Sequence, residues 1–303
     1  MNRKGGVGKT SITANVAGVL AGAGYRVLAI DLDAQGNLGD DLGYRATDLN
    51  DEGAALFEAV AMGKALVPTK GIRENLDVIP AGERTSVLAD HLMVQSLRRP
   101  DQNENLALRL SEIADNYDLI LLDCPPGDAA LQTQALIAAR WILTPTQPDA
   151  GSLKGLEQLT DRVVATLPAN PTLSFMGVVL FPMLTSAKRV QADVRATLET
   201  MMGKIAPTFT STIRFAQAAG VDARSRGQLV IELARDAEGQ DRFAWTKALR
   251  KQGDDGDEPG APTRRLADSV GSLASDYLKL TEEILLTLAE QERRSTEATG
   301  APA

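Results

Sequence analysis

The sequence predicts an α/β fold, a doubly wound and mostly parallel sheet flanked by helices, and two observations indicate it. Short and almost wholly apolar runs alternate along the chain with longer stretches of helical periodicity. The apolar runs do not alternate with polar residues, which is typical of strands buried on both faces of a parallel sheet. The chain has 303 residues, enough for one large domain of this kind.

The strand candidates are short and rich in Val, Ile and Leu. They cover residues 26–31, 75–80, 118–123, 141–145 and 174–180. Helical spacing of apolar residues is found around them, for example over residues 10–22, 106–117, 153–167 and 187–202. This order of strands and helices predicts parallel strands that are joined by crossover helices.

Two segments depart from this pattern. Residues 235–265 contain the cluster GDDGDEPGAP, whose composition predicts a flexible insertion. It is either a partner-binding segment or a tolerated surface loop, and we favour the loop. Helical spacing resumes over residues 266–290, and the polar residues 291–303 are expected to form a disordered tail. We therefore expect a single domain over residues 1–303.

The composition excludes several classes of function. Lys and Arg total 32 and Asp and Glu total 40, so the net charge of −8 does not attract DNA or anionic lipid to the surface as a whole. Cys124 is the only cysteine and His91 the only histidine. One chain therefore cannot build a disulfide framework, a multi-cysteine zinc site or an iron–sulfur cluster. No apolar run approaches the ~20 residues that span a bilayer, so we expect a cytoplasmic protein without a membrane partner.

The strongest functional signal is the run Lys-Gly-Gly-Val-Gly-Lys-Thr at residues 4–10, which leads into a helical stretch. Glycines let backbone N–H groups close around a phosphate, and the following helix aims its N-terminus at the anion. Lys9 supplies a positive charge to the terminal phosphates, and the Thr10 hydroxyl is placed to ligate Mg²⁺. The predicted nucleotide-binding residues are Lys4, Gly5, Gly6, Val7, Gly8, Lys9, Thr10 and Ser11.

The second lysine of this loop, Lys4, needs a role of its own because Lys9 already serves the bound phosphates. It could neutralise charge that develops on a phosphate held by another subunit. The alternative is a solvated lysine beside the loop. The residues alone leave both interpretations open, and we count Lys4 and Lys9 as candidate catalytic residues.

Two of the apolar runs lead into carboxylates. The run at 118–123 ends in Asp123, where a carboxylate can hold Mg²⁺ through water and complement Thr10. The run at 26–31 leads into Asp33, a candidate for orienting or deprotonating the attacking water. Because open α/β sheets bind ligands at the carboxyl ends of their strands, we expect the loop and both carboxylates to meet there.

Three motifs together resemble those of the deviant-Walker ATPases, most of all the ParA/Soj partition branch. They are KGGVGKT at residues 4–10, DLDAQGN at 31–37 and DLILLDCPP at 118–126. The resemblance runs from the first residues to about Leu233 and resumes over 266–290. It implies the P-loop NTPase fold, with ATP and Mg²⁺ as cofactors.

The resemblance also implies roles and partners. Lys4 matches the signature lysine that reaches across an ATP-bound homodimer, and Asp33 matches the residue that positions the hydrolytic water. Asp123 matches the Walker B carboxylate, so Thr10, Asp33 and Asp123 form the expected metal site. Proteins of this branch bind double-stranded DNA without sequence preference, hydrolyse ATP when a ParB-like partner stimulates them, and segregate plasmids or chromosomes. A nucleoid-associated protein is therefore expected.

A local basic segment could supply the DNA surface. Residues 181–230 carry seven basic and three acidic side chains, a charge of 7 − 3 = +4 within an acidic chain. Salt-sensitive phosphate binding needs such a patch, although a mixed solvated surface is the alternative. The candidate DNA contacts are Lys188, Arg189, Arg195, Arg214 and Arg224.

The start of the sequence departs from the ParA/Soj pattern. Only Met1-Asn2-Arg3 precede Lys4, whereas members of the family carry an extended apolar run there. We therefore expect the first strand to be missing, through a start assigned too late or a truncation.

Two other functions stay open. A MinD-like positioning ATPase would act on a membrane or a protein scaffold, and the mainly acidic last helix argues against the membrane. A non-hydrolysing binding module would follow if the incomplete first strand disabled catalysis.

Overall fold

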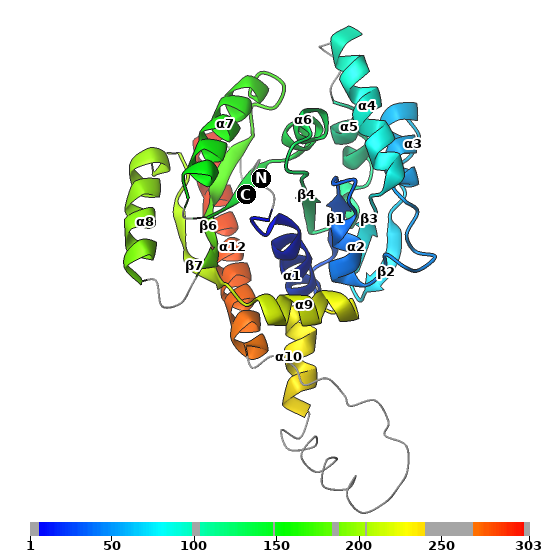
Figure 1. The fold of residues 1–303 in the computed structure, drawn as a ribbon. Helices are drawn as coiled ribbons and strands as arrows, with labels where there is room; N and C mark the ends of the chain where they lie inside the picture. Colours follow the sequence, from blue (N-terminus) through cyan, green and yellow to red (C-terminus); the bar gives the residue numbers. More distant parts are fainter. Residues whose placement is uncertain are drawn as a thin grey trace, which may run out of the picture.

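The structure, a computed structural model, describes residues 6–98, 104–147, 149–183, 188–203, 205–239 and 269–299. Within these residues the strands form two sheets (Figure 1). The first has the order β2 (Thr69–Arg73), β3 (Leu76–Ile79), β1 (Val27–Asp31) and β4 (Leu119–Asp123). The second has the order β5 (Trp141–Thr146), β6 (Ser174–Met183) and β7 (Thr208–Arg214).

The described strand pairs are parallel, except for β2 and β3 at one edge of the first sheet. All five residues of β1 are buried, because helices cover both faces of the sheet. In the register of β1 and β4, Val27 lies beside Leu119 and Asp31 beside Asp123. Two carboxylates are therefore neighbours at the carboxyl edge of the first sheet.

The helices cover the two faces of the sheets. One face carries α3 (Ala54–Met62), α4 (Glu83–Arg98), α5 (Asn105–Ser111), α6 (Ala129–Ala138), α7 (Ala150–Thr166) and α8 (Lys188–Met202). The other carries α1 (Lys9–Gly22), α2 (Asn37–Leu42), α9 (Gln217–Arg226), α10 (Val230–Gly239) and α12 (Val270–Thr299). A short 3-10 helix, Ala114–Asn116, precedes β4. Each face has its own apolar core, so the predicted doubly wound α/β fold is confirmed.

The five strand candidates are confirmed to within a few residues, and the structure adds two strands that the sequence analysis missed. These are β2, with the sequence TKGIR, and β7, with the sequence TFTSTIR. Both lie at the outer edge of their sheet and are only partly buried. Edge strands carry more polar residues than central ones, so the search for apolar runs passed over them.

The disordered tail expected over residues 291–303 is wrong for the part that the structure describes, because α12 continues as a helix to residue 299. The side chains of this last part hold the helix to the second sheet. Gln291 Nε2 donates to the carbonyl oxygen of Met176 at 3.2 Å, and Trp141 Nε1 donates to Glu292 Oε1 at 2.9 Å. Gln291 and Glu292 are polar, so the sequence suggested that they are exposed to solvent. In the structure their side chains hydrogen-bond to the second sheet instead.

Some expectations fall outside the described residues. Residues 235–239 end α10, and residues 240–265, the rest of the expected insertion, are not described, so the insertion stays a prediction. Among the described helices, none has the length and apolar character needed to cross a membrane.

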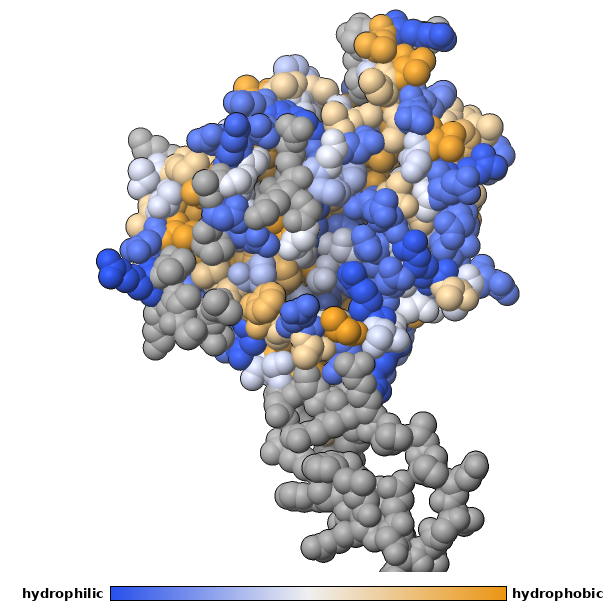
Figure 2. Space-filling model, viewed as in Figure 1, coloured by the Kyte–Doolittle hydropathy of each residue, from blue (hydrophilic) through white to orange (hydrophobic). Residues whose placement is uncertain are grey.

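The surface is largely hydrophilic on the face shown in Figure 2. The outer end of α4 is an exception, where Met93, Val94 and Leu97 are exposed. A largely apolar cavity lies inside the molecule.

It has a volume of about 550 Å³, lies between the two sheets and is lined by both β4 and β5.

Candidate functional site

The described part of the phosphate loop begins at Gly6 and leads into α1. Gly6 and Gly8 have φ values of 74° and 79°, a left-handed conformation that glycine adopts without strain. Gly8 is also tightly packed, because a Cβ placed there would overlap the ring of Phe181 on β6. Lys4 and Gly5 lie outside the described residues, so their roles stay predictions.

The N-terminus of α1 is suited to an anion. Its N-cap is Gly8, no side chain caps it, and no acidic residue lies in its first turn. The first N–H groups of a helix have no partner within the helix, and the helix dipole adds positive charge at this end. The first turn carries Lys9, Thr10 and Ser11. The loop and this turn can therefore bind a phosphate through backbone donors and one cationic side chain.

Lys9 lies near the carboxylates at the edge of the first sheet. Burial lowers the pKa of its ammonium group, and the charges of Asp123 and Asp33 oppose that shift. The structure thus brings together three residues that stand far apart in the sequence, as the sequence analysis expected.

Asp123 is the least satisfied polar group of this edge. Its side chain is buried, and neither oxygen accepts a hydrogen bond of good geometry. Burial raises the pKa of Asp123 to about 7, although the nearby hydroxyl of Thr10 and the charge of Lys9 act to lower it. A buried carboxylate without a partner is costly, and a cation would stabilise it.

The residues at this edge fit Mg²⁺. This ion is usually bound by one or two carboxylates, the phosphates of a substrate and several waters, not by an all-protein cage. Thr10, Asp33 and Asp123 can supply the protein part of such a set. Among the described residues, no cluster of three or more His, Cys, Asp or Glu side chains could hold a metal ion.

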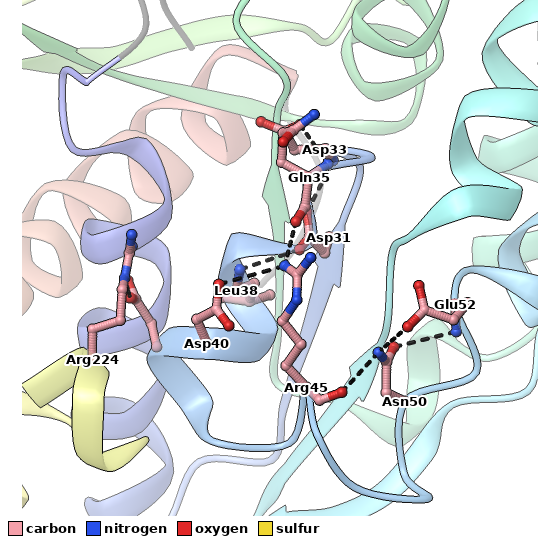
Figure 3. A network of polar contacts seen from close by, with 10 residues as sticks. Asp31, Asp33, Gln35, Leu38, Asp40, Arg45, Asn50, Glu52 and Arg224 are labelled. Atoms are coloured by element: carbon pink, nitrogen blue, oxygen red, sulfur yellow. Dashed lines mark hydrogen bonds and ion pairs between the residues drawn. The ribbon is translucent and has the colours of Figure 1, made fainter.

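Asp31 is a positioning residue that the sequence analysis did not select. It is fully buried, and its oxygens accept hydrogen bonds from the backbone N–H groups of Asp33 at 2.9 Å and Leu38 at 3.3 Å (Figure 3). Burial raises the pKa of Asp31 well above its ordinary value, and the neighbouring Asp123 adds to the rise. In the sequence, the only signal for this role is that Asp31 and Asp33 stand two residues apart. In the structure, the side chain of Asp31 binds the backbone of the loop that carries Asp33.

The loop that carries Asp33 is also held from outside. Asp33 Oδ1 accepts a hydrogen bond from the backbone N–H of Gln35 at 3.0 Å, and the guanidinium of Arg45 donates to the Gln35 carbonyl oxygen (Figure 3). The same Arg45 group lies 3.4 Å from an oxygen of Asp40. Asp33 is therefore fixed in place while its side chain stays only half-buried.

Arg195 and Arg214, two of the predicted DNA contacts, form hydrogen bonds with other parts of the protein. The Arg195 guanidinium donates to the carbonyl oxygens of Phe209 and Thr210, at 2.5 and 2.8 Å. Arg214 Nε donates to Asp276 Oδ2 at 2.6 Å, and its Nη2 donates to Oδ1 at 2.8 Å. This hydrogen bonding raises the pKa of Arg214. Both arginines thereby stabilise β7 against its neighbours.

The five predicted DNA contacts do not share one element. Arg224 on α9 donates from Nε to Asp41 Oδ1 of α2 at 2.6 Å. Lys188 and Arg189 begin α8, and Arg189 is exposed. A count of basic residues along the sequence cannot show that an arginine has an acidic partner some 180 residues away.

A second cavity, of about 310 Å³, adjoins the phosphate loop. It extends from Gly6 and Ser11 to Phe181, Phe215 and Gln217. Aromatic rings beside an amide side chain can bind a planar heterocycle such as a nucleobase. The sequence analysis did not select Phe215 or Gln217, because no motif marks them.

Comparison with known proteins identifies the family. Residues 1–174 match the family AAA_31, described as an AAA domain. The chromosome partitioning protein ParA of Caulobacter vibrioides is 37% identical over 204 residues, which cover 64% of this chain and 73% of that protein. The chain belongs to the ParA/Soj family. The resemblance noted from the three motifs is thereby confirmed for this ParA-family chain.

Other similarities agree. The chromosome partitioning protein ParA of Myxococcus xanthus is 35% identical over 186 residues, 59% of this chain and 62% of that protein, so the chain spans less than two thirds of this relative's length. Apo McdA from Cyanothece has a TM-score of 0.66 and 21% identity, covering 77% of this chain and 90% of that one. Cobyrinic acid a,c-diamide synthase from Mycobacterium smegmatis, solved with an ATP analog and magnesium, has a TM-score of 0.61 and 22% identity, covering 88% and 96%. These two structures share the fold of this ParA-family chain.

Proposed function

We propose that this ParA-family chain is a partition ATPase that hydrolyses ATP, with Mg²⁺, to ADP and phosphate. The observation that carries the proposal is the uncapped N-terminus of α1, whose Lys9 and Thr10 lie within reach of the unsatisfied carboxylate of Asp123. Such a site offers positive charge to phosphates and a carboxylate to a cation. The names of two relatives as chromosome partitioning proteins support the biological role.

The residues have distinct tasks in this proposal. Mg²⁺, when bound, neutralises charge on the phosphate oxygens, and Thr10, Asp33 and Asp123 would hold it directly or through water. Lys9 binds and orients the terminal phosphates. Asp33 accepts a hydrogen bond from the attacking water and so orients it toward the terminal phosphorus. The hydrogen bonds of Asp31 and Gln35 keep the Asp33 loop in place for this task.

The proposal includes a homodimer that forms on ATP binding, in which Lys4 of each protomer reaches the nucleotide of its partner. It also includes binding to double-stranded DNA of any sequence at the nucleoid, and release when a ParB-like partner stimulates hydrolysis. Because Arg195, Arg214 and Arg224 have partners within the fold, the proposed DNA contacts narrow to Lys188 and Arg189 at the start of α8.

The first test is binding to random-sequence duplex DNA with ATP, with ADP and without nucleotide, over a series of salt concentrations. We expect binding that requires ATP and weakens as salt increases, because phosphate contacts release counterions. Lys9→Ala should remove the dependence on ATP, whereas Lys279→Ala, on the exposed side of α12, should not. Equal binding with ATP and ADP contradicts the switch. ATP hydrolysis without DNA binding points to a scaffold- or membrane-positioning ATPase.

The second test is phosphate release with Mg²⁺ and with a chelator. We expect hydrolysis only with the metal. Asp33→Ala should slow it and leave ATP-bound dimers that persist in size-exclusion chromatography. Equal hydrolysis by the wild type and by Asp33→Ala rejects the role that we assign to Asp33.

A further inference from the structure

Helix α2 follows directly on the loop that carries Asp33, so the place of this helix bears on the place of that carboxylate. In its first turn, the backbone N–H of Leu38 donates to Asp31. At its far end, Leu42 is buried and Gly43 closes the helix with a φ of 76°. The contacts at this far end come from α9, from the turn after α9 and from the edge strand β2.

Two glycines bring the ends of α2 and α9 together with no side chain between them. Gly43 ends α2 and Gly227 ends α9, both in the left-handed conformation. A Cβ on Gly227 would lie 2.4 Å from Gly43 Cα, and a Cβ on Gly43 would lie 2.6 Å from the carbonyl oxygen of Gly227. The two helix ends therefore pack backbone against backbone, and a shift of one is transmitted to the other.

Two arginines hold the same contact. Arg224 of α9 lies beside α2 (Figure 3), and its Nε donates to Oδ1 of the buried Asp41 at 2.6 Å. Arg73 of β2 donates to the carbonyl oxygen of Leu42 at 2.8 Å and to that of Gly227 at 3.1 Å. Carbonyl oxygens at a helix end lack a donor within the helix, and a cation there is favourable. The end of α2 is thus tied to α9 by an ion pair and by a shared arginine.

The same face of α9 borders the second cavity. Gly220, Val221 and Arg224 line this cavity, and so does Asp41 of α2. Two roles can therefore be separated for Arg224 and Asp41. A direct contact with a nucleotide in the cavity would change its binding, whereas a hold on α2 would change the chemistry at Asp33.

We propose that Asp41 and Arg224 are positioning residues for hydrolysis, which hold α2 against α9 and thereby fix the carboxylate of Asp33. Neither side chain contacts the reacting phosphate, and both act through the loop between β1 and α2. This inference rests on the proposed function, in which Asp33 orients the attacking water. The contact of Gly43 with Gly227 makes the arrangement stiff enough to transmit the position of α9 to the loop.

The first test measures kcat and KM for ATP in the full chain with Arg224→Gln, with Asp41→Asn and with both, at a temperature where all are folded. We expect each single variant to lower kcat by about 10-fold and to keep KM within about twofold, because Asp33 is misplaced while Lys9 is not. The double variant should be no slower than either single variant, since both substitutions break the same contact.

Arg26→Gln is the matched control for the ion pair. It breaks the pair with Asp118, 2.7 Å long, at the amino end of β1, which is the end opposite the Asp33 loop. It should leave kcat unchanged.

A glycine pair tests the backbone contact. Gly227→Ala should lower kcat like the charge variants, because its Cβ drives α9 away from α2. Gly63→Ala is its control. Gly63 also has a positive φ, of 72°, at the end of α3, but a Cβ there meets nothing within 4 Å, so kcat should not change.

Hydrogen exchange of residues 33–42 reports on the loop and α2 without any hydrolysis. We expect these amides to exchange faster in Arg224→Gln and in Asp41→Asn than in the wild type and in Arg26→Gln. If the wild type releases no phosphate, the proposed function fails, and the exchange rates alone then decide whether the pair holds the loop.

Four outcomes overturn the proposal. An unchanged kcat in variants of lower stability leaves the pair a purely structural role. A raised KM with an unchanged kcat assigns it to nucleotide contact. Additive losses in the double variant show that the two residues act separately. Equal exchange rates in all variants show that the pair does not hold the loop.

Discussion

Asp31 and Asp123 lie side by side at the ends of adjacent parallel strands, yet their surroundings differ. Both are buried, and burial raises the pKa of both. Asp31 accepts two backbone hydrogen bonds from the loop that follows it, whereas Asp123 accepts none of good geometry. A satisfied carboxylate at this edge stabilises the protein's own backbone, and an unsatisfied one is available to a ligand.

The largest expected effect is on catalysis and separates the two aspartates. Asp123→Asn removes the charge available to Mg²⁺, so phosphate release should fall by about 100-fold or more. The unfolding temperature should stay the same or rise, because a neutral amide replaces a buried carboxylate whose oxygens accept no hydrogen bond of good geometry. Thermal unfolding and phosphate release, measured on the same sample, check this. A variant that hydrolyses ATP like the wild type contradicts the ligand role of Asp123.

The next effect is on stability and concerns Asp31. Asp31→Ala leaves the N–H groups of Asp33 and Leu38 without their acceptor, which should cost about 2–4 kcal/mol and lower the unfolding temperature by about 5–10 °C. Asp48→Ala, at an exposed aspartate, is the matched control and should change little. If the two substitutions are equally mild, Asp31 does not hold the loop.

A pH series sharpens the same comparison. Because the pKa of Asp123 in the folded chain is raised to about 7, the folded state holds a proton that the unfolded state releases near pH 4. The contribution that the protonated Asp123 makes to the free energy of unfolding is therefore lost as pH rises from about 4 to 7. Without nucleotide, the advantage of Asp123→Asn in unfolding temperature should grow over that window. Mg²⁺ with nucleotide should restore the stability of the wild type at neutral pH. If the difference in unfolding temperature between Asp123→Asn and the wild type does not change with pH, the raised pKa of Asp123 is contradicted.

The smallest effects separate arginines of the fold from arginines that contact DNA. Arg224→Ala breaks the contact with Asp41 and should lower the unfolding temperature by a few degrees. Its DNA affinity at a temperature where it is folded should stay unchanged. Arg189→Ala should leave stability alone, weaken DNA binding and reduce the salt slope by about one. If instead Arg224→Ala weakens DNA binding and Arg189→Ala does not, the DNA contact lies on α9.

Most of the fold and the centre of the site could be predicted from the sequence, because their signals are local. The glycine and lysine pattern around Lys9 and the apolar runs leading into Asp33 and Asp123 each occupy a few consecutive residues. The edge strands β2 and β7 lack such a signal, since their polar residues are compatible with a loop. The helical part of residues 291–299 was also missed, because its contacts with Trp141 and Met176 are made across the whole chain.

The roles of the arginines could not be predicted for a related reason. Arg195, Arg214 and Arg224 add to a basic segment when charges are counted along the sequence. Their hydrogen-bond acceptors come from β7, α12 and α2, and the last two lie 62 and 183 residues away. Net charge over a window describes the potential far from a surface, not the partner of each side chain.

Helix α12 packs against α1, so that two helices far apart in the sequence share one apolar core. On the ribosome, α1 emerges about 250 residues before α12. At about 5–20 residues per second, α1 waits roughly 12–50 s for its partner. During synthesis the part of the apolar face of α1 that packs against α12 is thus exposed until α12 has emerged.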